Sequence, residues 1–203
     1  ALHTSVAKQW RELVGSPIVE GYGLTETSPV ITFNPLDGSA KNGTIGIPAP
    51  STYAKCVDED GNEVPVGEPG ELVATGPQVM AGYWTQPDET AATIVDGWLY
   101  TGDVAEMDAE GFFTSVDRKK DVIVVSGFNV YPNEIEDQIA AVPGVAEVGV
   151  IGLPDGRSGE RVEAFVVSGD SAVTSEQILA HSRKNLAGYT LPQRITADHK
   201  LPK

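Results

Sequence analysis

The spacing of apolar residues changes at residues 117–120 and divides the chain into two parts. From residue 43 to 117, apolar residues come in short alternating runs, separated by glycine-containing turns such as Asp60–Gly61. This pattern is typical of short antiparallel strands. After Lys120, strand-like runs alternate with two segments whose apolar residues recur every three or four positions, as in amphipathic helices. We therefore expect an α+β chain with two domains.

The first part begins with apolar residues at helical spacing over residues 1–14, and Gly15 ends this pattern. Residues 17–23 then predict a short buried strand that leads into a glycine loop. From about residue 43 we expect an all-β subdomain, which the many short strands predict to be a distorted barrel.

The sequence pattern of the second part predicts the element order β-β-α-β-β-α-β. Pro132 marks the start of its first helix, because proline suits the first helical position. Thr174 and Gln177 form a capping box at the start of the second helix. This order favours a small α+β sandwich with the helices on one face of the sheet.

The chain has 29 acidic and 14 basic residues and a net charge of −15. Such a charge argues against nonspecific nucleic-acid binding, which depends on clustered lysine and arginine. It favours an acidic soluble enzyme instead. A nucleotide site in such an enzyme would need local positive charge, and residues 117–120 are the densest basic cluster.

A single cysteine, Cys56, excludes an internal disulfide and a multi-cysteine metal site. Its strand-like surroundings favour a buried inert thiol over a nucleophile. No apolar run approaches the roughly 18 residues of a transmembrane helix, so we expect no such segment. These features are compatible with a cytoplasmic protein, and peripheral membrane contact stays open.

Three segments carry residues that are suited to nucleotide chemistry: GYGLTET at 21–27, WLYTGD at 98–103 and DRKKDVIVVSGFNVYPNEIE at 117–136. In the first, a carboxylate beside a hydroxyl can supply a metal ligand and a phosphate donor together; the alternative is a loop with a helix cap. In the second, Asp103 follows a strand and a glycine, which suits a grip on a ribose diol. The alternative is an ordinary turn aspartate.

In this order, the three segments resemble the AMP-forming acyl-CoA synthetase superfamily, which includes luciferases and peptide-synthetase adenylation domains. The resemblance spans the whole chain and is closest to bacterial long- and medium-chain fatty-acid CoA ligases. It implies a two-step reaction: a carboxylate attacks ATP to give acyl-AMP and pyrophosphate, and the CoA thiol then displaces AMP. The implied cofactors and substrates are Mg²⁺, ATP, CoA and a fatty acid.

The resemblance implies roles for four residues of the first segment. Tyr22 matches an aromatic residue near the adenine, and Gly23 lets the backbone approach the nucleotide. Thr25 matches a phosphate contact, and Glu26 matches the residue that holds Mg²⁺. Thr25 and Glu26 are therefore the implied catalytic residues of this segment.

The second and third segments are expected to complete the nucleotide site. Asp103 and Arg118 match the residues that bind the ribose. Lys120 matches the hinge, also a catalytic position, at which the small domain swings between an adenylating and a thioester-forming orientation. We interpret Lys119 as a solvated residue.

Ser126, Gly127 and Phe128 match the loop that lines the CoA pantetheine tunnel in the thioester-forming orientation. Gly127 would allow the thiol arm to approach closely. The same residues are also typical of a glycine-containing hairpin turn, and the two interpretations are compatible.

The resemblance implies that residues 1–117 are the C-terminal part of the large adenylate-forming domain and that residues 118–203 are a mobile C-terminal domain, truncated at its end. The family's Ser/Thr/Gly-rich phosphate loop and its terminal catalytic lysine have no match here, and Lys203 does not match that lysine. We therefore expect the 203-residue chain alone to be inactive. Two alternatives remain: an adenylation enzyme that loads a carrier protein, and a non-catalytic binding or folding module.

Overall fold

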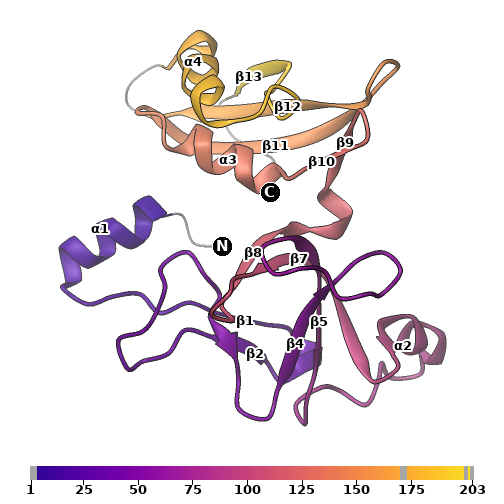
Figure 1. Ribbon diagram of the computed structural model, residues 1–203. Helices are drawn as coiled ribbons and strands as arrows, with labels where there is room; N and C mark the ends of the chain where they lie inside the picture. The colour runs from indigo at the N-terminus through magenta and orange to yellow at the C-terminus, as the bar shows by residue number, and fades with distance from the viewer. Residues whose placement is uncertain (1–3, 170–172, 199–200, 202–203) are drawn as a thin grey trace. The chain divides into compact units, whose positions relative to one another are not determined.

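The computed structural model describes residues 4–169, 173–198 and 201 (Figure 1). They form two compact units, Ala1–Lys119 and Lys120–Lys203. Each unit has a hydrophobic core of its own. Within the described ranges, no helix is long and apolar enough to cross a membrane.

Unit 1 starts with helix α1 (Thr4–Val14), which ends where Gly15 adopts a φ of +75° and donates its N–H to the carbonyl of Arg11. The predicted helical segment thus forms, and residues 1–3 of that prediction lie outside the described residues. The α1 side chains of Trp10 and Leu13 are exposed.

A three-stranded antiparallel sheet follows, in the order β1-β2-β3. Its strands are β1 (Gly21–Gly23), β2 (Val30–Phe33) and β3 (Ile47–Pro48). A short 3-10 helix, η1 (Thr25–Thr27), joins the first two strands. A Cβ at Gly23 would lie 1.7 Å from the carbonyl oxygen of Pro29, so close packing within the chain already requires glycine there.

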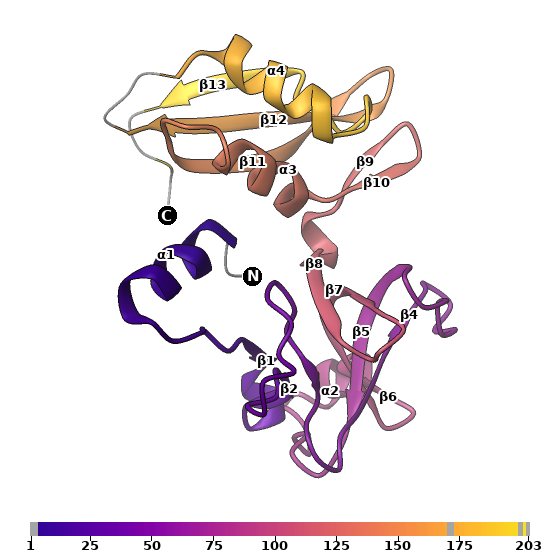
Figure 2. The same ribbon diagram turned by 60° about the vertical axis from the view of Figure 1, so that its left-hand side comes forward.

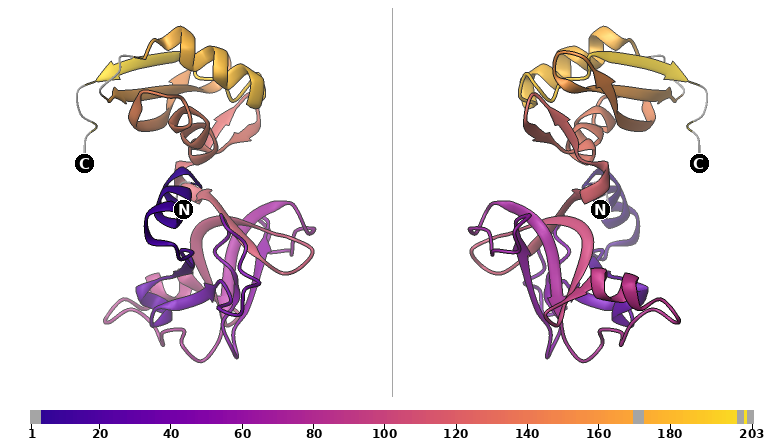
Figure 3. Two further views of the ribbon diagram at one scale, coloured as in Figure 1. Left: turned by 90° about the vertical axis from the view of Figure 1, so that its left-hand side faces the viewer. Right: turned by 90° about the vertical axis from the view of Figure 1, so that its right-hand side faces the viewer.

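A second sheet of five strands curls around the core of unit 1 (Figure 3). Strand β5 pairs with β4 on one side and with β7 on the other, and β6 and β8 share the second edge of β7. The bounds are β4 (Tyr53–Val57), β5 (Pro69–Thr75), β6 (Ile94–Val95), β7 (Trp98–Met107) and β8 (Phe113–Arg118). Phe113 and Leu72 are fully buried in the core, beside the buried thiol of Cys56. Burial raises the pKa of that thiol to about 12, which favours the inert form expected from the sequence.

The prediction that residues 43–117 are all β is wrong in one place, because helix α2 (Pro87–Thr93) lies within them. Proline occupies its first turn together with Asp88 and Glu89, which suit a helix N-terminus. None of its residues is buried. The helix therefore has no apolar periodicity in the sequence, and its start signals alone could have revealed it.

Unit 2 has the predicted order β-β-α-β-β-α-β. Its elements are β9 (Ile123–Val125), β10 (Phe128–Val130), α3 (Pro132–Ala140), β11 (Val145–Asp155), β12 (Gly159–Ser168), α4 (Ser175–Asn185) and β13 (Arg194–Asp198). A 3-10 helix, η2 (Lys119–Asp121), precedes them and spans the sequence boundary between the two units. Helix α3 begins at Pro132, and Thr174 and Gln177 form the predicted capping box of α4.

The sheet of unit 2 runs β10-β9-β12-β11, and β13 pairs with β12 in parallel. Figure 2 shows α3 and α4 on the same side of this sheet. Ile135 and Ile139 of α3 and Ile178 of α4 form one core with the inward-facing Val162 and Val166 of β12. The predicted α+β class, with a distorted barrel followed by a small sandwich, is thus confirmed, and the barrel takes the form of a curled, half-barrel sheet.

Candidate active site

Three strands of unit 1 bring Tyr22, Asp103 and Arg118 together. Asp103 on β7 is directly paired with Arg118 on β8, and the Arg118 Nε lies 3.8 Å from Oδ1 of Asp103. The Tyr22 hydroxyl, on β1, donates a hydrogen bond of 2.6 Å to Oδ2 of the same carboxylate. Residues predicted from three separate sequence segments therefore form one cluster.

The environment of this cluster keeps Tyr22 as a hydrogen-bond donor. Burial raises the pKa of the Tyr22 phenol, and the hydrogen bond to Asp103 raises it further. The Asp103 side chain is 21% exposed and that of Arg118 is 65% exposed. Because an exposed ion pair stabilises a protein by only about 0–1 kcal/mol, the Arg118 guanidinium can turn to another acceptor at little cost.

A bulge in β7 presents Asp103. Three residues, Thr101, Gly102 and Asp103, lie opposite the single residue Leu72 of β5, because the register between these strands shifts there. The Thr101 hydroxyl donates to the Leu72 carbonyl at 2.7 Å and accepts the N–H of Asp103 at 3.2 Å. Bulges are a common means of redirecting a side chain beside a functional site. Thr101 was not among the site residues predicted from the sequence.

Glu26 lies in η1 and is partly buried. The Tyr83 hydroxyl donates to its Oε1 at 2.9 Å, and the N–H of Met80 donates to its backbone carbonyl at 2.8 Å. The hydrogen bond to Glu26 raises the pKa of Tyr83. Tyr83 therefore contacts a predicted site residue, although it was not itself among the residues predicted from the sequence.

The loop around Glu26 is fixed by the buried side chain of Thr27. Its hydroxyl accepts the N–H of Leu24 at 3.0 Å and donates to the Pro29 carbonyl at 2.7 Å. Thr25, by contrast, is exposed, so its hydroxyl can reach a ligand.

Glu26 could supply one carboxylate to a metal ion. Among the described residues, no group of three or more histidine, cysteine, aspartate or glutamate side chains is arranged to hold a metal. Mg²⁺ is commonly bound by one or two carboxylates, with phosphate and water oxygens completing its octahedron. A single Glu26 carboxylate fits that kind of site, in which a nucleotide provides the remaining ligands.

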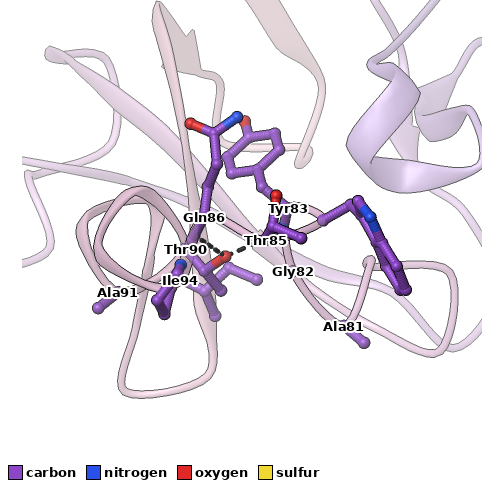
Figure 4. Close-up of a pocket in the computed structure, with 10 residues that line it drawn as sticks. Ala81, Gly82, Tyr83, Thr85, Gln86, Thr90, Ala91 and Ile94 are labelled. Carbon is purple, nitrogen blue, oxygen red and sulfur yellow. Dashed lines mark hydrogen bonds between the residues drawn. The ribbon is translucent and has the colours of Figure 1, made fainter.

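An open pocket of about 680 Å³ lies beside Tyr83 (Figure 4). Its lining comes from residues 81–94, which include α2. Thr90 holds the pocket wall together, because its hydroxyl accepts the N–H of Tyr83 at 2.9 Å and donates to the Gln86 carbonyl at 2.8 Å. The backbone of Tyr83 is thereby fixed while its hydroxyl contacts Glu26.

Unit 2 carries the second set of predicted residues. Ser126 and Gly127 form the turn between β9 and β10 with φ angles of +53° and +84°, and the N–H of Ser126 donates to the Ser158 carbonyl at 2.7 Å. Apart from Gly127 and its two chain neighbours, no described residue has an atom within 4 Å of a Cβ built at Gly127, so the positive φ is what favours glycine there. Phe128 stacks on Tyr189 with ring centroids 4.7 Å apart. Lys120 is exposed in η2.

Two family models match the chain. Residues 1–84 match the AMP-binding enzyme model, and residues 134–203 match the model of the AMP-binding enzyme C-terminal domain. The chain belongs to the AMP-binding enzyme family. The resemblance found in the sequence is thus confirmed.

The chain is 54% identical over 198 residues to a long-chain-fatty-acid–CoA ligase of Escherichia coli, and the alignment covers 98% of the chain and 35% of that protein. The Bacillus subtilis protein of the same name is 44% identical over 205 residues, with 100% and 37% covered. The chain therefore spans just over a third of the length of these curated relatives.

Two solved structures show the same fold. The chain matches ATP-bound MatB from Rhodopseudomonas palustris with a TM-score of 0.93 and 37% identity, over 98% of the chain and 40% of MatB. It matches the anthranilate CoA ligase AuaEII, solved with anthranoyl-AMP, with a TM-score of 0.91 and 31% identity, over 100% of the chain and 40% of AuaEII.

Proposed function

We propose that the chain is part of an AMP-forming fatty-acid CoA ligase and that it contributes the ribose grip, a magnesium ligand and the CoA-binding loop. The cluster of Tyr22, Asp103 and Arg118 carries this proposal, because it places a carboxylate and a guanidinium side by side on adjacent strands. The 54% identity to a long-chain-fatty-acid–CoA ligase supports a fatty acid as the substrate.

In the first step, the fatty-acid carboxylate attacks the α-phosphorus of ATP, and pyrophosphate leaves. Asp103 accepts hydrogen bonds from the ribose hydroxyls, and Arg118 donates to the ribose. Tyr22 holds Oδ2 of Asp103, so Oδ1, the oxygen that lies toward Arg118, takes the ribose hydroxyl. The aromatic ring of Tyr22 borders the adenine, and Gly23 keeps the adjacent backbone close to the nucleotide.

Glu26 and Thr25 act at the phosphates. A bound Mg²⁺ would neutralise charge that develops on the phosphate oxygens. Glu26 would hold that ion, with its carboxylate oriented by Tyr83. The exposed Thr25 hydroxyl would donate to a phosphate oxygen.

In the second step, the CoA thiol attacks the acyl carbon of acyl-AMP, and AMP leaves. The turn at Ser126, Gly127 and Phe128 lines the path of the pantetheine arm. Lys120 is the hinge between residues 1–117, the end of the large domain, and residues 118–203, the mobile domain. The division of the structure into two compact units at Lys119–Lys120 supports a hinge at this place.

The proposal is tested with the full-length enzyme that contains this segment. Fatty-acid-dependent and Mg²⁺-dependent exchange of pyrophosphate into ATP is expected, followed by acyl-CoA formation when CoA is added. Asp103→Ala is the comparison variant, in which both reactions should weaken. Absence of exchange in the wild-type enzyme would contradict the proposal, and transfer to a carrier protein with none to CoA would favour the carrier-loading alternative.

The 203-residue chain alone is expected to make no acyl-adenylate, because it carries no match to the family's phosphate loop or catalytic lysine. Each group that stabilises the developing charge lowers the activation free energy by roughly 3–4 kcal/mol, so the loss of two such groups should leave no measurable rate. Robust pyrophosphate exchange by the isolated chain would contradict this expectation. Such a polypeptide would act at most as a binding or folding module.

A further inference from the structure

Glu71 is a buried carboxylate next to the candidate ribose site. It lies on β5, and its side chain is only 8% exposed. A buried charge is costly unless it is paired and hydrogen-bonded. Both of its oxygens have partners: Oε1 accepts the N–H of Gly102 at 3.1 Å, and Oε2 accepts from Nζ of Lys119 at 2.7 Å.

The first contact fixes the bulge that presents Asp103. Gly102 directly precedes Asp103 and has a φ of +73°, a left-handed conformation that glycine adopts without strain. The strands β5 and β7 lose their regular pairing at this point, and the Glu71 side chain takes the N–H that the bulge leaves without a ladder partner.

The second contact fixes the chain next to Arg118. Lys119 directly follows Arg118, and its ammonium group reaches Glu71 across 48 residues of sequence. The Lys119 side chain is half exposed, at 51%, so its stem extends from solvent to the buried carboxylate. The prediction that Lys119 is a solvated residue is therefore wrong for its ammonium group, which binds Glu71.

One carboxylate thus binds the immediate sequence neighbours of both members of the Asp103–Arg118 pair. We propose that Glu71 is a positioning residue for this pair, which sets the direction of Asp103 through Gly102 and anchors Arg118 through Lys119. This inference rests on the proposed function, in which the pair binds the ribose of ATP.

Three substitutions separate the contacts. Glu71→Ala removes both contacts. Glu71→Gln retains an amide oxygen for Gly102 and loses the charge that attracts Lys119. Glu71→Asp retains the charge and shortens its reach by one methylene. Glu106→Ala, an exposed glutamate on β7, is the matched control.

The test measures KM for ATP and kcat in pyrophosphate exchange by the full-length enzyme, with the melting temperature of each variant. We expect Glu71→Ala to raise KM for ATP about tenfold, the size of one lost hydrogen bond to a charged group, with kcat changed less than about twofold. Glu71→Gln should restore most of the affinity, and Glu106→Ala should match the wild type. A purely structural role would instead lower kcat through a smaller folded fraction and leave KM unchanged.

If Glu71→Ala does not fold, Glu71→Asp carries the test and should show the same rise in KM. An active wild-type enzyme whose folded Glu71 variants keep KM for ATP within about twofold would overturn the role of Glu71 and leave the proposed function intact. A wild-type enzyme without exchange would instead overturn the proposed function.

Discussion

The phenol of Tyr22 donates a hydrogen bond of 2.6 Å to the Asp103 carboxylate, although the two residues are 81 positions apart in the sequence. This contact joins β1 to the bulge of β7. It also gives the two carboxylate oxygens different partners, because Oδ2 accepts the Tyr22 hydrogen bond while Oδ1 lies toward Arg118. The orientation of Asp103 therefore depends on the Tyr22 hydroxyl.

Tyr22→Phe should weaken ATP binding while leaving the ring that borders the adenine in place. We expect KM for ATP in the full-length enzyme to rise about fivefold, which corresponds to one hydrogen bond of about 1 kcal/mol. Pyrophosphate exchange at varied ATP measures this change. Tyr53→Phe, which alters a 71% exposed tyrosine on β4, is the control. Equal KM values for Tyr22→Phe and the wild type would show that the hydroxyl does not orient Asp103.

Tyr83→Phe should raise the Mg²⁺ concentration needed for half-maximal exchange. The substitution removes the donor that orients the Glu26 carboxylate. Losing a residue that orients a metal ligand typically costs about 10-fold or more in metal affinity. A Mg²⁺ titration at fixed ATP measures the effect, again with Tyr53→Phe as control. If the Mg²⁺ dependence stays unchanged in both Tyr83→Phe and Glu26→Gln, Glu26 is not the metal ligand.

Because of Asp108, the stability of unit 1 should fall as the pH becomes acidic. The Lys41 ammonium at 2.6 Å, and then the N–H of Phe112, hold the pKa of this carboxyl below its ordinary value. A lowered pKa means that the ionised group stabilises the fold above pH about 4 and that this contribution is lost as the pH falls through the folded-state pKa.

Asp108→Asn should therefore lower the melting temperature at pH 7. The difference from the wild type should shrink as the pH falls from about 4, the pKa of an aspartate in the unfolded chain, through the lower pKa of Asp108 in the folded chain. Thermal unfolding of the 203-residue chain across this range measures it. Asp60→Asn, in an exposed turn, is the control. A difference that stays constant with pH would contradict the role of the Asp108 charge.

Limited proteolysis should cut the chain first between residues 117 and 121. Lys119 and Lys120 are exposed, and the two compact units meet in the sequence at this point. A protease of broad specificity, followed by mass spectrometry of the first fragments, is the measurement. First cuts spread over several loops, such as the turn between β11 and β12, would argue against two independently folded domains.

Features that depend on local sequence could be predicted, and those that depend on distant contacts could not. Pro132 and the Thr174 capping box predicted the starts of α3 and α4, because each signal lies within a few residues of the start of its helix. Helix α2 was missed because it buries no side chain and so leaves no apolar period.

The same distinction between local signals and distant contacts applies to the candidate site. The family resemblance indicated roles for Tyr22, Glu26 and Asp103, but sequence spacing contains no sign of which side chains touch them. Tyr83 lies 57 residues from Glu26, and Glu71 lies 31 residues from Gly102. Both contacts arise only when segments distant in the sequence come together in the fold, so the sequence alone did not show that Tyr83 and Glu71 border the candidate site.

The most direct test of the account compares the two half-reactions in Lys120→Pro and Asp103→Ala of the full-length enzyme. Proline fixes its own φ and disfavours helical backbone at the preceding residue, so it should restrict a hinge at η2. Lys120→Pro should keep pyrophosphate exchange and lose acyl-CoA formation, whereas Asp103→Ala should weaken both steps, because ribose binding serves both. Equal loss of both half-reactions in a folded Lys120→Pro variant, or unchanged exchange in Asp103→Ala, would contradict the account.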